Sequence, residues 1–141
     1  MGKVEISLES AALVTRVDVA IAALMEAANC LAGADAPEIF VAALDNNHHL
    51  WRRLVEIAPK AGWRLPEKRL RDFVLAASSN NSRRVLDSDV ESLIQFNCDV
   101  AAEYGSDRNV DKILCDVEFA WKNSGAALGL SFQAWLLAEL G

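Results

Sequence analysis

The chain has 141 residues and a formal net charge of −6, from 14 basic and 20 acidic side chains. This length fits one domain that can bury an adequate core without disulfide or metal support. The acidic balance argues against a protein that coats nucleic acid or binds membranes through basic residues. The three cysteines are widely spaced and odd in number, which predicts reduced thiols and a cytoplasmic protein.

The first long apolar stretch, 11–32, predicts a helix of a soluble protein. Three charged residues interrupt it, so it is unsuited to span a membrane, and the residues before it lack the apolar core of a signal peptide. We expect Ser7 to cap this helix and Gly33 to end it with a positive φ. Its more polar face is formed by Thr15, Asp18, Ala22, Glu26 and Asn29. The apolar stripe opposite is Leu13, Val17, Ile21, Leu24, Ala28 and Leu31.

A second helix is predicted from its capping residues. Asp35 suits the N-cap, Pro37 the first turn and Glu38 the reciprocal capping position. We expect it to run to Ala58, because Pro59 interrupts helical hydrogen bonding. Its inner stripe is Phe40, Ala43, Leu44, Asn47, Trp51, Leu54 and Ala58.

Four shorter amphipathic segments follow. A third helix starts at Pro66 and ends or weakens at 78–82. A fourth starts with the capping box Ser88–Glu91 and ends at Gly105, and a fifth stops near Gly125. Their apolar positions, with those of a short last helix, are Leu70, Phe73, Val74 and Ala77; Val90, Leu93, Ile94, Asn97, Ala101 and Tyr104; Val110, Ile113, Leu114, Val117 and Trp121; Phe132, Trp135, Leu136 and Leu140. The sequence therefore predicts an all-α fold, a single-domain bundle of five to six helices over residues 1–141.

Positive charge is concentrated in the middle of the chain. The stretch Arg52–Arg84 holds nine basic and three acidic side chains, a net +6, which leaves −12 for the rest. One interpretation is a surface for RNA or an acidic partner. The other is that acidic neighbouring helices pack beside the stretch and neutralise it.

Residues with catalytic or metal-binding chemistry are few. Asp45, His48 and His49 share one helix face and are the only candidate metal ligands, but no further histidine exists to complete a site. Neither a phosphate-binding glycine loop nor a nucleophile–base pair stands out. We therefore expect a protein that is not an enzyme, with no catalytic residue, no cofactor and no metal.

Two asparagines interrupt otherwise apolar stripes. Asn47 and Asn97 would each destabilise the fold by about 1–3 kcal/mol if buried without a hydrogen-bond partner. Each therefore needs a partner: the other asparagine, a backbone group, or a helix of another protein. The first two alternatives give an internal structural role, and the third gives a role in binding.

Several of these residues form an ordered set of motifs. Asn47, Leu50 and Trp51 make an N-x-x-L-W pattern, followed by Leu65-Pro66 and Leu70-Arg71. Ile94, Asn97, Val100 and Ala101 then make an I-x-x-N-x-x-[VI]-A pattern. In order and spacing this set resembles the FlaF family of flagellin-synthesis regulators. The resemblance covers residues 39–104, with 107–141 as a C-terminal helical extension.

The resemblance implies a small, helical, non-enzymatic protein that acts in flagellum assembly. Such proteins promote flagellin synthesis or secretion, bind flagellin as chaperone-like adaptors, and act in balance with the repressor FlbT. Flagellin is thus the expected partner, a FlbT-like regulator a further candidate, and messenger RNA, bound by Arg52–Arg84, the alternative; no membrane is expected as a partner. The candidate partner-binding residues are Asn47, Trp51, Arg71, Asn97 and Trp135.

The last segment, Phe132–Leu140, concentrates large apolar side chains near the end of the sequence. It predicts a sixth core helix that closes the bundle. Two alternatives remain: a displaceable lid over the groove that takes the partner helix, or an element exchanged in a dimer.

Overall fold

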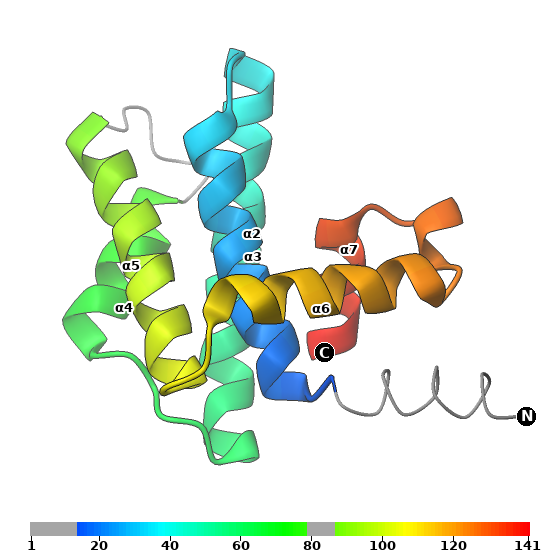
Figure 1. The fold of residues 1–141 in the computed structure, drawn as a ribbon. Helices are drawn as coiled ribbons and strands as arrows, with labels where there is room; N and C mark the ends of the chain where they lie inside the picture. The colour runs from blue at the N-terminus through cyan, green and yellow to red at the C-terminus, as the bar shows by residue number, and fades with distance from the viewer. Residues whose placement is uncertain (1–13, 79–86) are drawn as a thin grey trace, which may run out of the picture.

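The computed structural model describes residues 14–78 and 87–141. Figure 1 shows helices throughout this part, and no strand occurs among the described residues. The predicted all-α, single-domain bundle is therefore confirmed. The helices are α2 (Arg16–Gly33), α3 (Pro37–Ala61), α4 (Lys68–Ala77), α5 (Asp87–Gly105), α6 (Val110–Asn123) and α7 (Phe132–Leu140), with a 3₁₀ turn η1 (Ala126–Leu128) between the last two.

Helix α2 is the centre of the bundle. It packs against α3, α5, α6 and α7, so almost its whole circumference is covered (Figure 1). Its many alanines let these neighbours approach closely, and a helix that is apolar on all sides is typically a buried one. The predicted more polar face of this helix is correct only in part: Thr15 and Asn29 are exposed, but Asp18 and Ala22 are buried. Asp18 tolerates burial because its Oδ1 lies 2.8 Å from Nη2 of Arg108.

The first two helices begin at residues other than those predicted. Thr15, with extended backbone, caps α2 by accepting a hydrogen bond from the backbone N–H of Asp18 at 3.2 Å, whereas Ser7 lies outside the described residues. Helix α3 follows Ala36, which makes no side-chain cap, so Asp35 is not the N-cap. Pro37 occupies the first turn as predicted, where its missing N–H is harmless.

The ends of these helices also differ from the predictions. Gly33 is the last residue of α2, as expected, but its φ is not positive. Pro59 does not stop α3, because in the last turn it removes a single hydrogen bond while its own φ stays helical. The stop is Gly62, whose φ of 76° is left-handed, and the N–H of Trp63 bonds back to the carbonyl of Ala58 at 2.8 Å.

Helix α4 begins later than the predicted start at Pro66, and helix α5 begins earlier than the predicted capping box at Ser88. Pro66 precedes α4 and does not start it; its carbonyl instead accepts a hydrogen bond from Nε of Arg71 at 2.8 Å. Ser88 lies inside the first turn of α5, so it is not the N-cap of the predicted box. The expected break at 78–82 falls outside the described residues, except that Ser78 caps the end of α4.

Gly105 ends α5 as predicted, and the reason is steric. A Cβ at this position would lie 3.2 Å from Cγ1 of Val110 at the start of α6. The following residue, Ser106, takes the positive φ of 54° that turns the chain. The absence of a side chain at Gly105 thus lets α5 and α6 meet at a sharp corner.

Helix α7 runs antiparallel to α2. Near its start, Nε2 of Gln133 lies 2.7 Å from Sγ of Cys30, and at its end Nε and Nη2 of Arg16 donate to the carbonyl of Leu140 at 2.9 and 2.6 Å. In this conformation α7 is a core helix, since its four predicted apolar positions are buried: Phe132, Trp135, Leu136 and Leu140.

Candidate functional site

The two motif sets identified in the sequence meet inside the bundle. Asn47 and Trp51 lie one turn apart on α3, and Asn97 faces them from α5. Nε1 of Trp51 donates to Oδ1 of Asn97 at 2.8 Å, and Nδ2 of Asn97 donates to Oδ1 of Asn47 at 2.7 Å. The same Nδ2 lies 3.3 Å from the carbonyl of Leu24, in the middle of α2. One polar cluster therefore joins the three longest helices.

This cluster has no contact with solvent. Asn47, Trp51 and Asn97 each have an exposed fraction of 0%. Hydrogen bonds of this kind are strongest where water cannot compete for them, and they require one relative position of the helices. Nδ2 of Asn47 is the one group of the cluster that is buried without a partner among the described residues.

The structure thus places most of the predicted partner-binding residues in the interior. Trp135 is also buried, on α7, and Arg71 is half-buried with its Nε committed to Pro66. In this conformation Asn47, Trp51 and Asn97 have no exposed surface to offer a partner. For the two asparagines, the contacts favour the internal structural role, with each amide as the other's partner.

The remaining motif residues divide between the interior and its edge. Leu50, Val100 and Ala101 are buried, whereas Leu65, Pro66, Leu70 and Ile94 are half-buried. The buried ones belong to the faces with which α3 and α5 pack on α2, so in this conformation they offer no surface to another protein.

Asp45, His48 and His49 do not converge on a common point. Nε2 of His49 lies 3.4 Å from Oδ2 of Asp45, whereas Nδ1 of His48 lies 3.5 Å from Oγ of Ser78 on α4. Among residues 14–78 and 87–141, no three His, Cys, Asp or Glu side chains are grouped as ligands for a metal ion. His49 therefore pairs within α3, whereas His48 reaches the end of α4.

The thiols differ in their surroundings. Burial, and secondarily the charge of Glu26, raises the pKa of the Cys30 thiol to about 11. Burial, followed by the charge of Asp99, also raises the pKa of Cys98, while Cys115 is exposed on α6. A thiol with a raised pKa is a poor nucleophile at neutral pH, because the thiolate is the reactive form. Cys30 and Cys98 are therefore unsuited to nucleophilic catalysis.

We expect Cys115 to react first with a disulfide reagent such as DTNB at pH 8 in the folded protein. Cys30 should hold about a hundredfold less thiolate than a free cysteine, so its labelling should rise only as the pH approaches 11. Peptide mapping after timed labelling measures this order. The Cys115→Ser variant should lose the fast phase, and the three thiols should become similar in urea; fast labelling of Cys30 in the folded state would contradict the assignment.

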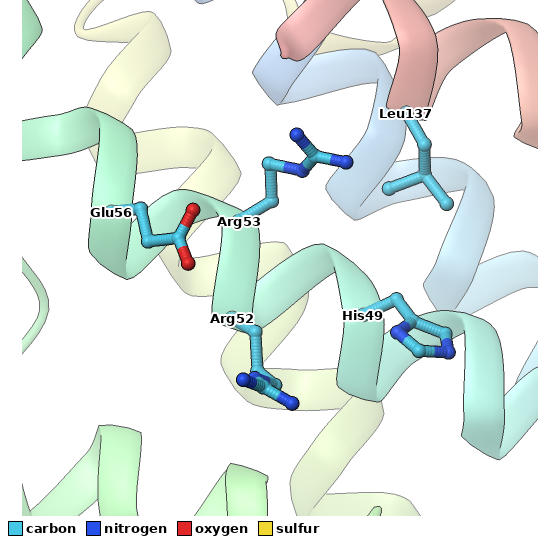
Figure 2. A pocket seen from close by; sticks show the side chains of 5 residues that line it. All are labelled: His49, Arg52, Arg53, Glu56 and Leu137. Carbon is cyan, nitrogen blue, oxygen red and sulfur yellow. The ribbon is translucent and has the colours of Figure 1, made fainter.

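An open hollow on the surface was not predicted from the sequence. It has a volume of about 390 Å³ and is lined by His49, Arg52, Arg53 and Glu56 of α3, with Leu137 of α7 (Figure 2). The helical spacing of the four α3 residues could have predicted from the sequence that they lie close together. The contribution of Leu137 could not have been predicted, because nothing in the sequence shows that α7 packs beside this part of α3.

The basic stretch is not one continuous free surface. Nζ of Lys68 lies 2.7 Å from Asp72, and Nε of Arg64 lies 3.4 Å from Glu103. Arg83 and Arg84 lie outside the described residues. Neutralisation by a neighbouring helix is seen for Arg64, whereas Arg52 and Arg53 are exposed, and their use as a surface for RNA or an acidic partner stays a prediction.

Comparison with known proteins identifies no relative. No family model matches the chain, and no significant match was found among curated proteins or solved structures. None of the helices in the described part is long and apolar enough to cross a membrane.

Proposed function

We propose that the chain is a FlaF-like, non-enzymatic regulator of flagellin synthesis and flagellum assembly, which binds flagellin as a chaperone-like adaptor in the cytoplasm. The observation that supports this proposal most is the contact between its two sequence motifs. The N-x-x-L-W and I-x-x-N-x-x-[VI]-A patterns are separated by more than 40 residues, yet Trp51, Asn47 and Asn97 form one hydrogen-bonded cluster. The two motifs, which carry the resemblance, thus form a single structural unit.

The helical surface supplies a physical basis for binding. The terminal segments of flagellin form amphipathic helices, which an adaptor must shield from early assembly. Helical bundles hold such segments by docking them along exposed apolar side chains. The described surface carries large exposed apolar side chains in two regions, with Ile39 and Val41 near the start of α3 and Phe119, Leu128 and Leu130 on α6 and after it.

The proposal is tested by mixing the purified chain with monomeric flagellin and measuring the complex by size-exclusion chromatography with light scattering. We expect a stable complex of defined stoichiometry, and no complex with flagellin that lacks its terminal helical segments. Light scattering of the chain alone also reports whether it is a monomer or a dimer. Absence of any complex with intact flagellin would contradict the proposal.

An RNA-binding regulator remains the alternative, because Arg52, Arg53 and Arg69 are exposed within the basic stretch. Binding to RNA backbone releases counterions, so affinity should fall steeply as salt increases. Measuring affinity for flagellin messenger RNA between 50 and 200 mM salt, roughly the range over which such binding collapses, separates the two functions. A tight, salt-sensitive complex would favour this alternative.

A further inference from the structure

The hollow between α3 and α7 is a positively charged surface on an acidic protein. Its α3 residues are His49, Arg52, Arg53 and Glu56; His49 lies three and four residues before the two arginines, and Glu56 lies four and three residues after them, so all four are neighbours on the helix surface. Two permanent positive charges thus face a single carboxylate. Neither Arg52 nor Arg53 forms an ion pair with another residue of the described ranges.

Arg53 is the residue best placed to bind an anion there. Figure 2 shows its guanidinium extending toward α7 and Leu137, whereas Arg52 extends to the other side of α3. The guanidinium of Arg53 also lies against Gly141, where an added side chain would clash with it. The neighbouring carbonyl of Leu140 already accepts two hydrogen bonds from Arg16, so its hydrogen-bonding capacity is satisfied without Arg53. The end of α7 thus limits where Arg53 can move and leaves its N–H groups available.

The composition of the hollow favours a carboxylate of a protein over the phosphates of RNA. The planar guanidinium can hold a carboxylate or a phosphate with two parallel hydrogen bonds, but Leu137 adds an apolar contact that suits the stem of an acidic side chain. The imidazole of His49 is the one aromatic ring among the described residues that line the hollow, so successive bases of an RNA strand would have a single ring to stack on. Glu56 and the overall charge of −6 oppose a polyanion more than they oppose one carboxylate.

We propose that this hollow is a carboxylate-binding site, in which Arg53 pairs with an acidic side chain of a partner polypeptide while Leu137 packs against its neighbouring apolar side chain. The identity of that partner as flagellin rests on the function proposed above, but the preference for a carboxylate beside an apolar group does not. Arg52 strengthens the site through its charge, and Glu56 weakens it.

A short peptide tests the site directly. The probe is acetyl-Leu-Glu-Leu-amide, with acetyl-Leu-Gln-Leu-amide as its uncharged match, titrated while NMR follows the Nε–H group of Arg53 and the methyl groups of Leu137. We expect a saturable shift of both signals with the glutamate peptide and at least a tenfold weaker response with the glutamine peptide. Equal responses to the two peptides, or stronger saturation by inorganic phosphate or a short oligouridylate, would overturn the proposal.

Variants of exposed residues locate the binding without unfolding the protein. Arg53→Gln should lower the affinity for the glutamate peptide at least tenfold, and Glu56→Gln should raise this affinity. Arg69→Gln is the matched control, since Arg69 is an exposed arginine on α4 that does not line the hollow. An effect of Arg69→Gln as large as that of Arg53→Gln would show only general charge attraction and would contradict a defined site.

The same variants separate this site from the proposed function. If the wild-type chain binds flagellin and Arg53→Gln weakens that complex about tenfold, both are supported. If Arg53→Gln binds flagellin like the wild type, the hollow is not where flagellin's carboxylate docks and the inference fails, while the proposed function stands. If the wild type binds no flagellin, the proposed function fails and the peptide titration alone decides whether the carboxylate site exists.

Discussion

Replacing Trp51 with alanine should lower the free energy of unfolding by about 3–5 kcal/mol. The side chain is fully buried, so its removal leaves a large cavity between α2, α3 and α5. It also removes the donor that Oδ1 of Asn97 accepts from, and a buried acceptor without a donor is unfavourable. Urea denaturation followed by circular dichroism measures the difference between the two proteins.

Two variants show which part of this effect is packing. Trp51→Phe keeps much of the ring volume but removes the N–H, so it should retain a loss of about 1–3 kcal/mol from the unpaired oxygen of Asn97. Trp63→Ala is the matched control, because Trp63 is half-buried and packs beside Tyr104 with ring centroids 5.9 Å apart. A loss below about 1 kcal/mol in Trp51→Ala would contradict its position in the core.

The second large effect is expected at Asn97. Its side chain forms hydrogen bonds with three groups: it accepts from Nε1 of Trp51 and donates to Oδ1 of Asn47 and to the carbonyl of Leu24. Asn97→Ala leaves the first two without their partners, and each unpaired buried group is unfavourable by about 1–3 kcal/mol. We therefore expect a loss of about 3 kcal/mol or more in the free energy of unfolding, measured in the same way.

Asn47 provides the internal comparison. It makes a single hydrogen bond in the cluster and already has a buried Nδ2 without a partner among the described residues, so Asn47→Ala should be milder than Asn97→Ala. Because the two side chains are bonded to each other, the double variant should lose less stability than the sum of the single variants. Strict additivity would show that the hydrogen bond between them contributes nothing.

These expectations affect how functional mutations are interpreted. A variant of Asn47, Trp51 or Asn97 that loses flagellin binding could do so because a larger fraction of the protein is unfolded and degraded. Loss of binding is informative about an interface only at exposed positions such as Arg53, Val41 or Leu128, where folding should be unaffected. Binding assays therefore need a stability measurement on the same variant.

The helical fold and most of the core follow from local patterns in the amino-acid sequence. Helical periodicity placed Leu54, Leu93, Val117 and Leu136 at interior positions, and all four are buried. It also predicted that Asn47 and Asn97 need partners, since an unpaired buried amide is too unfavourable to persist. These inferences depend on local spacing and on elementary energetics, both of which are present in the linear chain.

Which helix is central, and which side chains line the surface hollow, depends on how the helices pack in three dimensions. Periodicity detects one apolar face, so it assigned Asp18 and Ala22 to a polar face of α2; neighbouring helices bury both residues, and Arg108 forms an ion pair with Asp18 there. The hollow beside Arg53 depends on Leu137, which reaches α3 only because α7 packs antiparallel to α2. A contact between residues far apart in sequence is set by how helices pack, and no local pattern encodes that arrangement.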